Sequence, residues 1–194
     1  WPPGSTAASP QRPLYDLASL TKVSATTAAV MVLFDEHRIS LDAPVARYLP
    51  AFRRGAKAHV TIRELLEHRS GLPAGSNLSR RAHSHVRARE IVLRTALENP
   101  PASVQQYSDV GMDVLGFVVE AIVHEPLDRF ARRRIFAPLA MTSPTYRPGA
   151  PLRRHAAPTD PHPRRGHPPS GDAHSLPPYR PRPRPAPPRP PPPR

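Results

Sequence analysis

The sequence predicts a helix-rich domain followed by a segment that cannot form a core. In the first 150 residues, apolar residues recur at helical spacing in several stretches, and no stretch alternates apolar and polar residues as a half-buried strand does. From residue 151 onward, Val, Ile, Phe and Met are absent, and 17 of the 30 prolines occur there. So little apolar surface cannot offset chain entropy. We therefore expect a disordered N-terminal stretch (1–13), a folded domain (14–150) and a disordered, basic Pro-rich tail (151–194).

The first predicted helix covers residues 20–36 and carries Ser19 at its start and Lys22 in its first turn. Residues three apart share a face of a helix, so the two side chains can meet. A serine hydroxyl becomes a nucleophile when a nearby base removes its proton, and burial lowers the pKa of a lysine so that it can serve as that base. The alternative is an exposed lysine beside a serine that only caps the helix. We expect the inward side of this helix to be formed by Leu20, Val23, Thr27, Val30, Met31 and Phe34.

The later elements follow from caps and breaks. A short helical turn is expected over 45–49, before Pro50. Thr61 and Glu64 form a capping box that predicts a helix to residue 67, and a further helix is expected over 86–97. Ser108 is the expected cap of a helix over 109–123, and Pro126 opens a last helix that reaches residue 136.

Three motifs occur in a fixed order: Ser19-Leu20-Thr21-Lys22, His68-Arg69-Ser70-Gly71-Leu72-Pro73, and Tyr107-Ser108-Asp109 followed by Gly111 and Leu115-Gly116. Together they resemble the class C β-lactamase-like serine hydrolases, a family that includes penicillin-binding proteins, D-alanyl-D-alanine peptidases and related esterases. The resemblance covers residues 14–148. It implies the α+β fold of β-lactamases and transpeptidases, a helical cluster beside an antiparallel sheet, of which this chain holds mostly the helical part.

The resemblance also implies roles for individual residues. Ser19 would be the acylated nucleophile, Lys22 would accept or relay its proton, and Tyr107 would shuttle the proton to the leaving group. Asp109 would bind substrate at a place where many relatives have asparagine; a carboxylate cannot donate a hydrogen bond there, whereas an amide can. His68 is assigned mainly a structural role, with Gly71 required for a turn.

The implied reaction is acyl transfer on a small-molecule or peptide carbonyl, without a cofactor or a metal. The substrate stays open between a β-lactam, a D-Ala peptide and an ester. The family's third motif, a Lys-Thr-Gly or His-x-Gly strand, is not found in the 194 residues, so we expect an incomplete site and reduced activity. The alternative is a catalytically inactive fragment, or an interaction protein whose basic tail binds an acidic partner.

The formal net charge is +13, of which residues 151–194 contribute +7. Because Tyr179 is the only aromatic residue among these arginines, we expect no nucleic-acid binding. A shifted reading frame in a GC-rich gene is a further explanation of this tail. No apolar run is long enough to span a bilayer. Family members are often exported, but the chain begins at Trp1 without a signal peptide and is expected to be a fragment, so its compartment and oligomeric state stay open.

Overall fold

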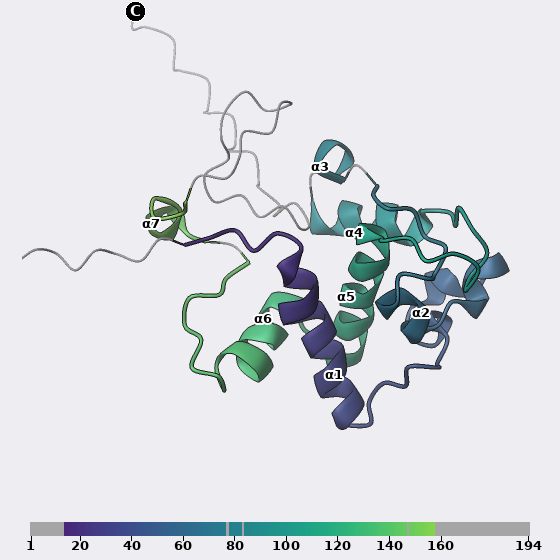
Figure 1. The fold of residues 1–194 in the computed structure, drawn as a ribbon, viewed down its shortest axis with the longest axis horizontal. Coiled ribbons are helices and arrows are strands. Elements are labelled where there is room, and N and C mark those ends of the chain that lie inside the picture. Colours follow the sequence, from purple (N-terminus) through teal and green to yellow (C-terminus); the bar gives the residue numbers. More distant parts are fainter. Residues whose placement is uncertain (1–13, 77, 83, 147, 158–194) are drawn as a thin grey trace, which may run out of the picture.

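The computed structural model describes residues 14–76, 78–82, 84–146 and 148–157 (Figure 1). This part of the chain is helical and contains no strand; it has two isolated bridges, a parallel one between Leu14 and Ala156 and an antiparallel one between Pro44 and Thr61. The helix-rich prediction is therefore confirmed here. The predicted N-terminal stretch (1–13) and residues 158–194 of the predicted tail lie outside the described residues.

The first helix is continuous from Leu20, and begins as a π-helix, η1 (Lys22–Thr27), before it continues as α1 (Ala28–Asp35). Its predicted inward side is largely wrong. Val30 is buried as expected, but the buried face otherwise consists of Ala25, Thr26, Ala29 and Leu33, whereas the exposed face carries Leu20, Val23, Met31 and Phe34. Because this helix is apolar on nearly every side, its hydrophobic pattern does not determine which face turns inward.

The middle of the chain forms short elements around the core. They are η2 (Val45–Arg47), η3 (Pro50–Phe52), η4 (Gly55–His59), α2 (Ile62–Leu66), α3 (Leu78–Arg81) and α4 (His85–Arg94). The capping box is confirmed: the Thr61 hydroxyl accepts from the Glu64 amide at 3.2 Å, and the Glu64 carboxylate accepts from the Thr61 amide at 2.9 Å. The helix expected over 86–97 is α4, which begins at His85 because Ser84 caps it, and ends earlier than expected, at Arg94.

The central helix is α5 (Asp109–Val123), which contacts α1, α2, α4 and α6 (Leu127–Ala131). In Figure 1 it lies between α1 and α2, with α4 across its upper end. Ser108 caps it as predicted, and its buried side chains include Val110, Val114, Phe117 and Val118. After α6 the chain continues as a second π-helix, η5 (Arg132–Phe136), so the last predicted helix is confirmed to residue 136.

The two ends of the main described region lie side by side (Figure 1). The Leu14 amide donates to the His155 carbonyl at 2.9 Å, and the Ala157 amide donates to the Leu14 carbonyl at 2.7 Å. Residues 148–157, which include α7 (Ala150–Arg153), thereby hold the segment that leads to Ser19. None of the helices in the described ranges is long and apolar enough to cross a membrane.

Candidate active site

Ser19 lies in a tight turn immediately before the first helix. The Asp16 carboxylate accepts a hydrogen bond from the Ala18 amide at 2.8 Å, and Ala18 adopts a left-handed conformation with φ of 44°. For a residue with a Cβ atom, this conformation is strained and has to be held by its surroundings. Within the described residues, no group accepts a hydrogen bond from the Ser19 amide. The turn therefore presents both the hydroxyl and a free amide of Ser19 at an exposed position.

Lys22 contacts the other predicted site residues. Its Nζ donates to Ser19 Oγ at 3.0 Å and pairs with Asp109 Oδ1 at 2.8 Å. The same Nζ lies 5.1 Å from the centre of the Tyr107 ring. The Lys22 side chain is 11% exposed and the Asp109 side chain 59%. The structure thus brings Ser19, Lys22, Tyr107 and Asp109 together from two distant parts of the sequence, at the start of η1 and the start of α5.

The charge of Lys22 differs from the sequence-based expectation. Burial by itself lowers the pKa of this amine, but the hydrogen bond to the Asp109 carboxylate and the interactions with Tyr107 outweigh burial, so the pKa is raised. The expected lowering is therefore wrong. Lys22 is an ammonium in this arrangement, and it donates to the serine oxygen.

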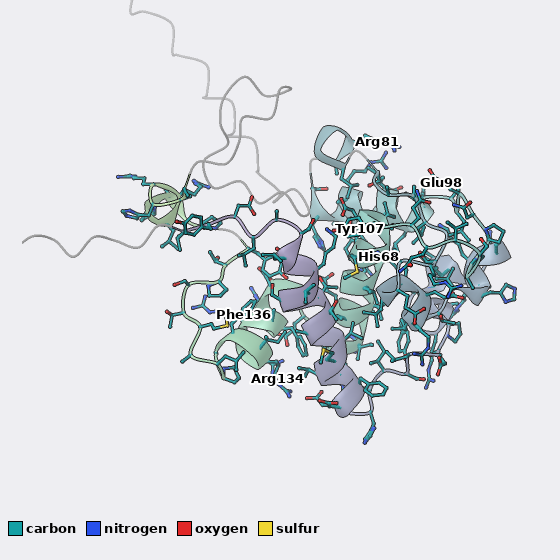
Figure 2. All side chains as sticks on the ribbon, in the orientation of Figure 1. His68, Arg81, Glu98, Tyr107, Arg134 and Phe136 are labelled. Atoms are coloured by element: carbon teal, nitrogen blue, oxygen red, sulfur yellow. The ribbon has the colours of Figure 1, made fainter. Side chains whose placement is uncertain are left out.

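His68 joins the second motif to the third (Figure 2). The Ser108 amide donates to His68 Nδ1 at 3.2 Å, and the imidazole lies against the Tyr107 ring with 4.7 Å between ring centres. Ser108 in turn donates from its hydroxyl to the Pro73 carbonyl at 2.6 Å and accepts from the Gly111 amide at 2.9 Å. The amide and the hydroxyl of Ser108 therefore hold the start of α5 against the loop that begins at His68.

Gly71 fits the role predicted for it. Its φ is +76°, and a Cβ atom at this position would lie 2.0 Å from the Asn99 carbonyl oxygen. Its own carbonyl accepts from the Glu98 amide at 2.8 Å and from the Asn99 amide at 3.3 Å. Only glycine combines this backbone conformation with such a close approach of the neighbouring chain.

Sequence reasoning did not identify two features of the site. One is the ion pair between Asp109 and Lys22, because no sequence pattern indicates that these two residues meet. The other is Asp113, one turn beyond Asp109 on α5, where burial raises the pKa of the carboxyl to about 8. The spacing of four residues between two aspartates on a predicted helix could have indicated the second feature.

An apolar cavity of about 120 Å³ borders the turn that carries Ser19, with Asp16, Leu17 and Thr21 in its lining. Its lining includes Tyr15, Ser24, Ala25, Phe136 and Tyr146, but neither Ser19 nor Lys22. The Tyr146 hydroxyl is buried and has no hydrogen-bond partner in the described part of the chain. The cavity therefore adds no group to the chemistry around Ser19.

Comparison with known proteins gives consistent matches. The family model described as Beta-lactamase matches residues 4–183. A protein of Escherichia coli (strain K12) named "Putative D-alanyl-D-alanine carboxypeptidase" is 36% identical over 148 residues, which are 70% of this chain and 34% of that protein. The chain thus spans about a third of the length of this curated relative.

Two solved structures show the same fold. A β-lactamase/D-alanine carboxypeptidase from Yersinia pestis, complexed with citrate, aligns with a TM-score of 0.62 at 24% identity, over 73% of this chain and 43% of that one. FmtA from Staphylococcus aureus aligns with a TM-score of 0.65 at 22% identity, over 74% of this chain and 40% of that one. At these identities the likeness concerns the fold alone.

Proposed function

The chain belongs to the β-lactamase family of serine hydrolases, and we propose that it transfers acyl groups through an acyl-enzyme on Ser19. The Ser19 oxygen attacks a carbonyl carbon while its proton passes to Lys22, in the fraction of molecules in which that amine is neutral. Tyr107 relays that proton from Lys22 to the leaving group, which departs as the carbonyl re-forms. Water then attacks the ester, releases the acid and restores the serine hydroxyl.

The observation that carries this proposal is the shared position of Lys22. Its Nζ is within hydrogen-bond distance of both Ser19 Oγ (3.0 Å) and Asp109 Oδ1 (2.8 Å), with the Tyr107 ring alongside. A helix N-terminus lies directly behind the serine, and it favours the negative charge that develops on the carbonyl oxygen. The Ser19 amide, which has no acceptor among the described residues, is a suitable donor to that oxygen.

The substrate class we propose is a D-alanyl peptide or an ester. Relatives of the chain are named D-alanyl-D-alanine carboxypeptidases, which motivates the first choice. Asp109 is the candidate for substrate contact because its side chain remains 59% exposed while it pairs with Lys22. Its carboxylate only accepts hydrogen bonds, so it suits a substrate that presents an N–H group rather than a carbonyl oxygen at this point.

Intact-mass spectrometry tests the proposal directly. The chain is incubated with a fluorophosphonate and, separately, with a penicillin, and the mass increase is followed over hours. Long incubation is needed because no Lys-Thr-Gly or His-x-Gly segment supplies a second oxyanion donor, and loss of one donor slows such reactions by about 10²–10³-fold.

Two serine-to-alanine variants provide the test and its control. Ser19→Ala should abolish the mass increase. Ser24→Ala should retain it, because the Ser24 hydroxyl is engaged with the Leu20 carbonyl at 2.9 Å and does not contact the cluster. Absence of any increase in folded wild-type chain, or equal labelling of Ser19→Ala, would contradict the proposal.

A further inference from the structure

His68 contacts three consecutive residues around the candidate relay tyrosine. Its carbonyl accepts from the Gln106 amide at 2.8 Å, and its Nδ1 accepts from the Ser108 amide at 3.2 Å. Between these two hydrogen bonds, its ring packs against the Tyr107 ring at 4.7 Å with an interplanar angle of 40°. The backbone on both sides of Tyr107 and the tyrosine ring itself are therefore held by one residue.

We propose that His68 is a positioning residue for Tyr107, whose ring it holds beside Lys22. Two hydrogen bonds fix the backbone of the tyrosine, but they do not choose its side-chain rotamer. Tyr107 is 52% exposed, so solvent leaves much of its ring unsupported. The His68 imidazole on one side and the Lys22 ammonium at 5.1 Å are two contacts that the Tyr107 ring makes. The contact with His68 therefore restricts the ring to the rotamer that reaches the ammonium.

The chemical state of His68 suits this role. Burial, together with the Lys22 charge, lowers the pKa of the imidazole, so the ring is neutral at neutral pH and Nδ1 is free to accept. A protonated ring would carry a hydrogen on Nδ1 and would repel the Ser108 amide. His68 also has φ of 56°, a conformation that costs a histidine energy and is retained where the surroundings enforce it. A role in proton transfer is not required by any of these contacts.

The alternative is that His68 only stabilises the turn, and His68→Asn separates the two roles. Asparagine tolerates the left-handed conformation, and its Oδ1 is bonded to Cγ as Nδ1 is in histidine. The turn and the hydrogen bond from the Ser108 amide can therefore persist. The ring against Tyr107 is lost. His124→Asn is the matched control, since His124 has φ of 58° at the end of α5 and is exposed.

The first readout does not depend on activity. In the wild-type chain, NOEs between the His68 and Tyr107 rings and restricted ¹³C relaxation of the Tyr107 ring are expected, with the signal assigned by its loss in Tyr107→Phe. In His68→Asn the Tyr107 ring should become motionally averaged, while in His124→Asn it should remain restricted. Absence of the NOEs, or equal restriction in His68→Asn, overturns the inference.

The second readout concerns catalysis and rests on the proposed function. The rate at which a fluorophosphonate labels Ser19 should fall about tenfold in His68→Asn, and should fall no further when Tyr107→Phe is already present. An equal fall in both backgrounds would mean that His68 does not act through Tyr107. If wild-type chain is not labelled, the proposed function fails, and the NMR measurement alone decides the positioning role.

Discussion

Replacing Asp109 by asparagine removes a carboxylate that favours the charged form of Lys22. The pair lies at 2.8 Å, where two unit charges attract by about 6 kcal/mol if the effective dielectric constant is 20. The Asp109 side chain is 59% exposed, however, and exposed ion pairs contribute at most about 1 kcal/mol because water screens them. The stabilisation of the charged form of Lys22 by Asp109 is therefore about 1 kcal/mol. This corresponds to a roughly fivefold larger fraction of neutral Lys22 at a given pH.

The neutral amine is the proposed base, so Asp109→Asn should label faster with a fluorophosphonate at neutral pH. The assay is the second-order rate of mass increase on Ser19 between pH 6 and pH 10. We expect about a fivefold gain throughout this range, because the pKa of Lys22 is raised above its ordinary value and the amine stays mostly charged up to pH 10.

Asp42→Asn is the matched control for this charge change. Asp42 pairs with Arg63 at the same distance of 2.8 Å, but it does not contact the cluster around Ser19. Its rate profile should equal that of the wild type. An unmoved or slower profile in Asp109→Asn would refute the reasoning, because either Asp109 does not set the charge of Lys22 or the neutral amine is not the base.

Three further outcomes are expected. Burial raises the pKa of Asp113 to about 8, so the folded chain loses stability as the pH rises from about 4 to 8. Asp113→Asn should therefore add about 1–3 kcal/mol to the free energy of unfolding at pH 8 and nothing at pH 4, as measured by urea titration. Gly71→Ala should destabilise the chain by about 3 kcal/mol in the same assay, whereas a cost near zero would mean that the loop yields. Met31→Lys with Phe34→Lys should reduce binding of a hydrophobic dye and self-association, while the control Val86→Lys leaves both unchanged.

Local chemistry explains which parts of the fold could be predicted. Thr61 and Ser108 begin α2 and α5 through hydrogen bonds within four residues, and such bonds depend on neighbouring sequence alone. The inward face of the first helix could not be predicted, because Leu20 and Met31 are as apolar as the buried Leu33. Tertiary packing against α5 and α6 decides that face.

The site shows the same division. The spacing of Ser19 and Lys22 correctly predicted that their side chains meet, since one helical turn suffices for that contact. The contacts of His68 with Tyr107 and Ser108 were not predictable, because they join two loops that approach each other only in the folded chain.

The protonation state of Lys22 depends both on its local sequence and on residues that only the fold brings close to it. A serine and a lysine three residues apart are read as an activated pair because burial favours the neutral amine. Here burial is opposed by the Asp109 carboxylate at the start of α5 and by Tyr107, which together outweigh it. In the proposed mechanism, the fraction of neutral Lys22 therefore depends on Asp109 and Tyr107 of the third motif as well as on the Ser-x-x-Lys motif. An amide at the same position could hold Lys22 by a hydrogen bond but would favour its charged form less than a carboxylate does, so we expect the choice between aspartate and asparagine at residue 109 to change how much neutral amine is present at neutral pH.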